Sequence, residues 1–397
     1  MNGKAYASIL SLVCLALGFL MSCSSSSTSS PPPPLSHTTR YLVVSDYDND
    51  RVLIYDSPFS TGESASVVLG QSGLTTSNGL GLTAAGMYAP VATAEDGDGN
   101  LYVNDTGYSR VLQFKPPFTN GMSASLVIGQ PDFTTGNPNG GAPNASQNSL
   151  NFAWGSAFDS SGNLWVVDTG NNRILEFQPP FATNMNASLV IGQPNFTSDA
   201  PSGPPYGSPT TNSGLDTPYM LAFDASGDLW VTDGGNSRVL EFVPPFANGM
   251  AATLVIGQPD FVSNVGATTA SGLAYPIGIA FDSAGNLWVE GGNRVLEFQP
   301  PFANGMNASL VLGQPNFTTN TSATSQNGTG NAEGIGFDSS GNLYVADYVN
   351  DRTLQFTPPF STNQNASLVF GQADFTSAGQ ATTATGQYRP AAVSAAF

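Results

Sequence analysis

Histidine, cysteine and cationic residues are scarce in this 397-residue chain, and each shortage excludes a kind of site. The single histidine is His37, so no later residue can supply a histidine base or a histidine-ligated metal centre. Both cysteines, Cys14 and Cys23, also precede residue 40, which leaves the rest of the chain without a disulfide or a reactive thiol. Ten Lys and Arg against 28 Asp and Glu give a net charge of −18. This argues against nucleic-acid binding, because phosphate contacts need clustered cations.

The first 22 residues have the pattern of an export signal. Lys4 precedes an apolar run from Ile9 to Met21 that is interrupted by serine and glycine and is too short for a membrane-spanning helix. The run ends in Leu20-Met21-Ser22-Cys23, which resembles a bacterial lipobox and predicts cleavage before Cys23 with lipid attached to that cysteine. Ordinary secretion with cleavage nearby is the alternative. We therefore expect an exported protein: either a lipoprotein of the outer membrane or cell surface, held to a membrane only by its lipid, or a secreted protein.

Residues 23–39 predict a tether between this signal and the folded part of the chain. A serine-rich run is followed by Pro31 to Pro34, and neither composition can build a core. The remaining chain, residues 40–397, is longer than the ~250–300 residues that usually share one hydrophobic core. A ring of repeated sheets avoids this limit, because each pair of neighbouring sheets forms its own small core.

One motif recurs six times after residue 40. Its third copy runs from Gly162 to Asp168, as Gly-Asn-Leu-Trp-Val-Val-Asp, and continues from Asn172 to Phe181, as Asn-Arg-Ile-Leu-Glu-Phe-Gln-Pro-Pro-Phe. The copies lie roughly 60 residues apart, which is longer than a solenoid repeat and typical of propeller blades. The arginine of the motif stands at Arg51, Arg110, Arg173, Arg238, Arg294 and Arg352.

Each copy predicts a four-stranded antiparallel blade, and the ends of the chain predict how the ring closes. In the third copy we expect strands over residues 155–158, 164–167, 173–178 and 187–192, with the long connections between blades all on one face. The first copy starts at Tyr41 without a preceding strand, whereas residues 389–394 match the first strand of another copy. The expected fold is therefore an all-β six-bladed propeller, whose C-terminal strand pairs into the first blade and removes the open edges.

These residues resemble the NHL-repeat family, whose pattern is close to Pro-x-Gly-Ile-Ala-x-Asp-x-x-Gly-Asn-Leu-Tyr-Val-Ala-Asp followed by Asn-x-Arg-Val. Residues 221–238, 276–292 and 333–347 each carry most of it, and the resemblance implies a six-bladed propeller. The fifth copy departs from the pattern. Between Trp288 and Arg294 it is two residues shorter than its neighbour, and we interpret Glu290 as standing where the other copies have aspartate. A shortened loop cannot make the same turn.

The repeated residues predict structure rather than chemistry. A catalytic centre needs one asymmetric constellation, whereas the Asp and Arg of the motif and its Gly-Gln pair recur around the ring. The NHL resemblance does not extend to peptide-amidating lyases, because their zinc site is built from histidines. Asp46-x-Asp48-x-Asp50 begins like a calcium loop, but Arg51 stands where that loop needs glycine. We predict no catalytic residue, no metal site and no cofactor.

One position of the repeat differs in every blade and supplies the candidate ligand-binding residues. It is the x of the Pro-x-Gly-like entry to the first strand, and we expect Trp154, Tyr219, Ile277 and Glu333 to line the mouth of the channel on the loop-rich face. Filling of the channel is the structural alternative. We expect a monomeric, non-catalytic binding or scaffold module for a protein, peptide or glycan. The alternative function is a divalent-metal-assisted, lactonase-like hydrolase at the channel, with Glu333 as a ligand.

Overall fold

The computed structural model describes residues 41–203 and 209–396. The predicted signal peptide of residues 1–22, the tether of residues 23–39 and the lipid attachment at Cys23 lie outside the described residues. The chain divides into two units, residues 1–37 and 38–397, and the second contains every described strand. Across these described ranges, no helix is both long and apolar enough to cross a membrane.

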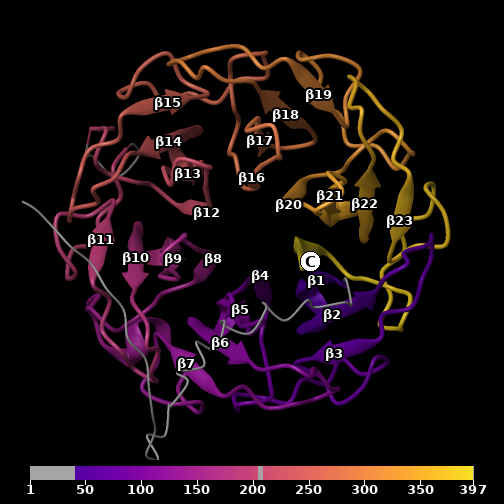
Figure 1. Cartoon of the computed structure of the whole chain (residues 1–397), viewed down its shortest axis with the longest axis horizontal. Coiled ribbons are helices and arrows are strands. Elements are labelled where there is room, and N and C mark those ends of the chain that lie inside the picture. Colours follow the sequence, from indigo (N-terminus) through magenta and orange to yellow (C-terminus); the bar gives the residue numbers. More distant parts are fainter. Residues whose placement is uncertain (1–40, 204–208, 397) are drawn as a thin grey trace, which may run out of the picture. The chain divides into compact units, whose positions relative to one another are not determined.

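Six four-stranded sheets surround a channel, which confirms the predicted propeller (Figure 1). Every pairing between strands is antiparallel, and the first strand of each blade lies nearest the centre. Blade 1 consists of β24 (Pro390–Ala396), β1 (Tyr41–Asp46), β2 (Arg51–Asp56) and β3 (Val67–Leu69); blade 2 of β4 (Pro90–Glu95), β5 (Leu101–Asp105), β6 (Arg110–Phe114) and β7 (Leu126–Ile128); blade 3 of β8 (Ala153–Phe158), β9 (Leu164–Asp168), β10 (Arg173–Phe177) and β11 (Leu189–Ile191); blade 4 of β12 (Pro218–Phe223), β13 (Leu229–Asp233), β14 (Arg238–Phe242) and β15 (Leu254–Ile256); blade 5 of β16 (Ile279–Phe281), β17 (Leu287–Glu290), β18 (Val295–Phe298) and β19 (Leu310–Leu312); and blade 6 of β20 (Ala332–Phe337), β21 (Leu343–Asp347), β22 (Arg352–Phe356) and β23 (Leu368–Phe370).

The two ends of the described chain close the ring, as predicted. β24 pairs with β1 from Tyr41 opposite Ala396 to Asp46 opposite Pro390, with a bulge near the latter pair. The first blade therefore takes its innermost strand from the C-terminal end, and no sheet is left one strand short.

Each interface between blades has its own aromatic core, so a single large core is not needed. β9 is buried along its whole length, and its Trp165 contacts Phe223 and Phe246 of blade 4 with ring centroids 5.7 and 4.9 Å apart. The indole N–H of Trp165 donates to Asp159 at 3.0 Å. Asp159 begins the turn between β8 and β9, where Gly162 supplies the positive φ. The same residue therefore organises a turn and satisfies a buried donor.

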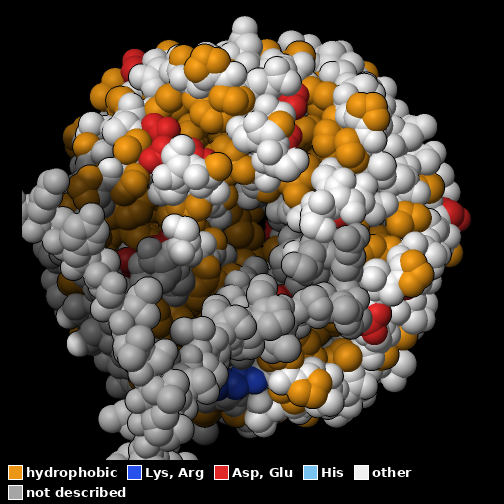
Figure 2. Space-filling view, viewed as in Figure 1, with side chains coloured by type: hydrophobic (Ala, Val, Ile, Leu, Met, Phe, Trp, Pro, Cys, Tyr) orange, Lys and Arg blue, Asp and Glu red, His pale blue; other side chains and the backbone are white. Residues whose placement is uncertain are grey.

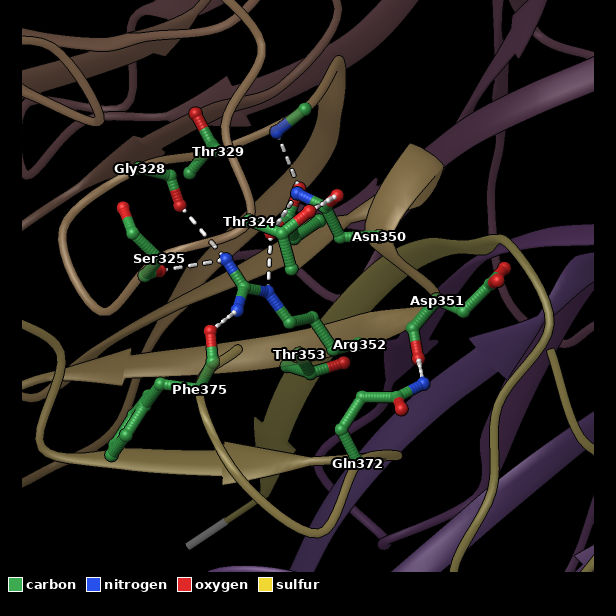
Figure 3. A network of polar contacts seen from close by, with 12 residues as sticks. Thr324, Ser325, Gly328, Thr329, Asn350, Asp351, Arg352, Thr353, Gln372 and Phe375 are labelled. Atoms are coloured by element: carbon green, nitrogen blue, oxygen red, sulfur yellow. Dashed lines mark hydrogen bonds and ion pairs between the residues drawn. The ribbon is translucent and has the colours of Figure 1, made fainter. Parts of the chain in front are cut away.

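The aspartate and arginine of the motif join the blade turn to the long connections. In blade 6, Arg352 donates to Asp347 at 2.6 Å and to the carbonyls of Ser325 and Gly328 at 2.9 Å each (Figure 3). It also donates to the carbonyl of Phe375, which follows the last strand of the blade. These contacts confirm the structural role predicted for the repeated pair.

The glutamine of the Gly-Gln pair holds the residue that precedes the arginine. Gln372 donates to the carbonyl of Asp351 at 2.8 Å (Figure 3). The corresponding glutamines of the other blades donate in the same way to Asn49 and Asp50, Ser109, Asn172, Ser237 and Asn293. The pair is therefore structural in all six blades.

Figure 2 shows one face of the ring, where hydrophobic side chains border a central hollow and Lys and Arg are scarce. Within the ring, a cavity of about 220 Å³ is lined by the first strands of all six blades. Thr93 and Ser394 share a 2.6 Å hydrogen bond on its wall. The interior of the channel thus has little charge, and the chemical variety of the ring lies at its mouth.

Candidate functional site at the mouth of the channel

Six residues at equivalent places form the mouth: in five blades the residue is the second of the first strand, and in blade 5 it lies two residues before β16. Four of them are the predicted site residues Trp154, Tyr219, Ile277 and Glu333, and the other two are Val91 and Ala391. The rings of Trp154 and Tyr219 meet edge to face with centroids 4.8 Å apart. Tyr219 and Ile277 belong to one buried apolar cluster with Val91 and Ala391, against which Trp154 packs. The structure therefore brings the apolar members together, and they fill much of the channel mouth.

A pocket of about 430 Å³ opens beside this cluster, between blades 3 and 4. Trp154 and Tyr219 line it together with Phe152, Thr169, Gly170, Asn172, Asp199, Pro201, Asp216 and Thr217. Its walls thus combine three aromatic rings with carboxylate, amide and hydroxyl groups, and the described residues that line it include neither Lys nor Arg. This volume lies within the range typical of small-molecule sites.

Two polar groups of the pocket have features that bear on binding. The indole Nε1 of Trp154 is buried and has no hydrogen-bond partner among the described residues. Burial raises the pKa of Asp216, and the hydroxyl of Thr217, which donates to it at 2.9 Å, partly offsets this effect. The pocket therefore has a carboxylate acceptor beside its aromatic rings, one of which carries a buried N–H without a partner among the described residues.

Phe152 and Asp216 were missed by sequence reasoning because they lie in the irregular connections before the first strands. The residue directly before each of these strands, or before the proline that leads into it in blade 5, has a left-handed backbone with φ between 45° and 55°: Ala89, Phe152, Thr217, Tyr275, Asn331 and Arg389. Such φ values are unusual for bulky residues. In each case the backbone N–H donates to a side chain of the preceding blade: Asp50, Ser109, Asn172, Ser237, Asn293 and Asp351.

The left-handed backbone and its hydrogen bond to the preceding blade turn large side chains outward around the mouth. The side chains of Phe152 and Tyr275 are both 49% exposed, and the Tyr275 hydroxyl is 2.7 Å from that of Tyr219. Arg389 is also exposed, pairs with Asp48 at 3.2 Å and lies over the ring of Tyr348. A positive φ just before the first strand therefore marks the residues around the mouth, but the pattern of a single sequence does not reveal such a φ.

Blade 5 requires a correction to the sequence interpretation. Glu290 pairs with Val295 across the sheet, exactly as Thr232 of blade 4 pairs with Val239, whereas Asp233 pairs with Arg238. Glu290 therefore occupies the position before the aspartate, and our interpretation that it replaces the aspartate was wrong. The two missing residues shift the alignment, so that the N–H of Gly291 bonds to the carbonyl of Arg294. The short 3₁₀ turn found at this point in the other five blades is absent from blade 5, as the shortened loop predicted.

Glu290 and Glu333 are buried glutamates near the mouth, and neither carboxyl group makes a hydrogen bond to another described residue. Both oxygens of Glu290 are without a partner among the described residues, and its side chain is fully buried. Burial raises the pKa of Glu290 well above its ordinary range, and the charge of Glu333 raises it further. Burial also raises the pKa of Glu333 to about 8, an effect that Arg389 opposes and Asp48 reinforces. The two groups are therefore electrostatically linked.

The metal-dependent alternative gains no support from this arrangement. In the described ranges, no three His, Cys, Asp or Glu side chains are grouped so that they could hold a metal ion. The Asp46-x-Asp48-x-Asp50 segment also spreads its carboxylates, because Asp46 pairs with Arg51, Asp48 pairs with Arg389, and Asp50 accepts from the N–H of Ala89. Asp48 and Glu290 are near enough to Glu333 to interact with its charge, but the three do not form a ligand shell.

Comparison with known proteins identifies the repeat and the fold. A family model of the NHL repeat matches residues 150–177, which include β8, β9 and β10. A protein of unknown function from Bacteroides caccae is similar over 90% of this chain and 99% of its own, with 10% identity and a TM-score of 0.51. Two further structures have TM-scores of 0.42: virginiamycin B lyase from Staphylococcus aureus, at 13% identity over 81% of this chain and 82% of its own, and a gluconolactonase from Xanthomonas campestris, at 15% identity over 85% and 86%. No curated protein matches the chain. The chain thus contains an NHL repeat within a six-bladed β-propeller.

Proposed function

We propose that this propeller is a non-catalytic binding module that holds a neutral glycan at its loop-rich mouth. The observation that carries the proposal is the pocket of about 430 Å³ lined by Phe152, Trp154 and Tyr219. These residues are not repeated at the equivalent positions of the other blades, so the site has the asymmetry that recognition of one ligand requires.

The chemistry of the pocket favours a sugar over the protein or peptide partners considered from the sequence. A sugar ring presents flat C–H faces that pack on aromatic rings, while its hydroxyls can both donate and accept hydrogen bonds. Asp216 and Asn172 supply acceptors for such hydroxyls, and the unpaired indole N–H of Trp154 supplies a donor. None of the described residues that line the pocket is a cation that could hold an acidic ligand. An uncharged saccharide therefore matches both the shape and the polarity of the site.

The expected place of action follows from the N-terminal pattern. An export signal with lipid on Cys23 would place the module in the cell envelope, where glycans are abundant, and secretion would place it outside the cell. No specific observation favours the lactonase-like alternative, since Glu333 lacks further metal ligands among the described residues.

The test is a glycan-binding screen of the purified chain, followed by titration of the best binder. We expect Trp154→Ala to weaken binding by about tenfold or more, because a buried aromatic contact at the centre of a site contributes at least ~1.4 kcal/mol. Tyr88→Ala is the matched control, since Tyr88 is an exposed aromatic residue outside the pocket. Equal affinity in Trp154→Ala, or a screen without any bound neutral glycan, would refute the proposal.

A further inference from the structure

Glu290 and Glu333 are each the only charged residue at a position that recurs six times around the ring. At the first-strand position of Glu333, the other blades have Val91, Trp154, Tyr219, Ile277 and Ala391. At the second-strand position of Glu290, they have Ser45, Asn104, Val167, Thr232 and Ala346. The fold therefore does not require a carboxylate at either position, and both exceptions occur at the interface between blades 5 and 6.

The side chain of Glu290 and the backbone of Glu333 both lie next to Gly278. A Cβ atom added to Gly278 would be 3.1 Å from the Cβ of Glu290 and 2.3 Å from the carbonyl oxygen of Glu333. In blade 4, the residue equivalent to Glu290 is Thr232, whose hydroxyl donates across the interface to the carbonyl of Ile277 at 2.9 Å. The second-strand position thus faces the first strand of the next blade, and in blade 5 it directs Glu290 towards Glu333.

Neither Glu290 nor Glu333 forms an ion pair among the described residues, although Arg294 and Arg389 are near enough to oppose part of the rise in the pKa of Glu290 and of Glu333, respectively. A buried carboxyl group that makes no hydrogen bond costs folding free energy, on the order of 1–3 kcal/mol even before it ionises. Arg294 donates instead to four backbone carbonyls, those of Ala267, Thr269, Gly272 and Phe317. Arg389 is engaged by Asp48 and is half exposed. Neither arginine forms an ion pair with Glu290 or Glu333.

Three tyrosine side chains lie near Glu333, the less buried of the two glutamates. Tyr47, Tyr219 and Tyr348 each have a raised pKa, first because of burial and then in part because of the nearby charge of Glu333. The rings of Tyr47 and Tyr348 are in contact, with centroids 6.2 Å apart. Aromatic faces next to a carboxylate favour an organic cation, because the ring quadrupole attracts positive charge.

We propose that Glu290 and Glu333 bind a primary ammonium group, such as that of a lysine side chain, which reaches them from the tyrosine-lined mouth. A primary ammonium has three N–H donors for two carboxylates and a tyrosine hydroxyl, and its slender alkyl stem suits a site where Glu290 is fully buried. A divalent metal fits less well, since it needs six or more oxygen ligands and the described residues group no third acidic side chain with these two. This site uses other polar groups than the glycan pocket, although the ring of Tyr219 is common to both.

The experiment is calorimetric titration of the purified chain with n-butylammonium chloride, with uncharged 1-pentanol as the probe of matched size. We expect butylammonium to bind and pentanol not to bind. Binding should release protons at pH 7, because an ammonium group stabilises the ionised form of carboxyl groups that burial keeps protonated. The release is measured from the heats in two buffers of different ionisation enthalpy, and this measurement needs no variant.

Matched variants locate the site. Glu333→Gln and Glu290→Gln should each weaken butylammonium binding by about tenfold or more, as expected for loss of a charge-assisted hydrogen bond. Glu297→Gln is the control, because Glu297 is a similarly buried glutamate of blade 5 whose carboxylate accepts from Ser309. Phe152→Ala should leave butylammonium binding unchanged, because Phe152 lines the glycan pocket but is not one of the residues beside Glu333.

Several results would overturn the proposal. These are equal binding of pentanol, binding without proton release, full affinity in Glu333→Gln, or no heat of binding at about 10 mM butylammonium, where even a weak site of Kd ~1 mM would be filled. Calcium or magnesium ions that bind and are lost in the same variants, while butylammonium does not bind, would replace the ammonium site with a metal site.

Discussion

Blades 3 and 5 are built from the same motif, yet the buried arginine of the motif has different hydrogen-bond partners in the two blades. In blade 3, Arg173 donates to the carboxylate of Asp168 at 2.7 Å, and both side chains are fully buried. Asp168 also accepts from Asn171 and from the N–H of Asn151. In blade 5, Arg294 is equally buried, but it makes no ion pair among the described residues and relies on backbone carbonyls.

The difference shows which part of the turn the ring needs. Arginine is present in all six blades and always binds the long connections, whereas the aspartate is missing from one. The arginine therefore ties the turn to the long connections in every blade, and the aspartate is its partner in five blades. Loss of two residues in blade 5 removed that partner and left Glu290 in a position that faces the next blade. The irregular blade is thus where the ring carries unpaired charge.

The largest effect should come from giving blade 3 the composition of blade 5. Asp168→Gly copies Gly291 and leaves Arg173 as a buried charge without its carboxylate. We expect this change to lower the free energy of unfolding by about 3–5 kcal/mol, as for other broken buried ion pairs. Urea unfolding followed by circular dichroism measures it, with Gly291→Ala as the control in blade 5. A loss below about 1 kcal/mol would mean that backbone carbonyls alone suffice in every blade.

A second test uses pH to expose the unpaired charge. The pKa of Glu333 is raised from 4.5 to about 8 in the folded protein, so the folded state holds its proton more tightly than the unfolded state does. The resulting stability is complete below pH ~4.5 and is lost as the pH rises through about 8. We expect thermal stability to fall between pH 6.5 and 9 by an amount equivalent to a few kcal/mol.

Glu333→Gln should reduce the slope of this part of the pH profile, because glutamine does not titrate, while Glu290, whose pKa is also raised by burial, accounts for the slope that is left. Burial also raises the pKa of Asp46 and Asp105, each to about 6. The changes in stability that accompany their ionisation are therefore largely complete before the pH reaches 6.5. Thermal melts of the parent chain and the variant across the range make the comparison. Parallel profiles would show that Glu333 ionises without cost, contrary to its buried position.

The smallest expected change is the repair of blade 5. Residues 290–293 are replaced by residues 167–172 of blade 3, which restores the aspartate and the missing length. We expect a gain of about 1–3 kcal/mol, because Arg294 acquires a hydrogen-bonded carboxylate and the unpaired carboxyl of Glu290 is removed. Chemical denaturation measures the gain, and butylammonium binding should disappear. A less stable chimera would indicate that blade 5 and its neighbours have adapted to the short turn.

Much of the fold was predictable because its signals are local. Six spaced arginines predicted six blades, and the Asp-x-x-Gly-Asn turns located the second strands. The short first copy and the match of residues 389–394 predicted closure by β24. The candidate site was predictable only in part. The position of Trp154, Tyr219, Ile277 and Glu333 in the repeat placed them at the mouth, but a role of these residues in binding stays a prediction.

The sequence by itself determined the number of blades, their turns, the closure of the ring and the absence of histidine chemistry, because each depends on residue types at short, repeated spacings. Only the tertiary structure decided which unrepeated side chains meet. Phe152 and Asp216 reach Trp154 from two different connections, and Glu290 faces Glu333 because strand pairing, rather than alignment of the motif, sets its register. Contacts between neighbouring blades depend on the closed ring, and a repeat read along one chain does not contain them.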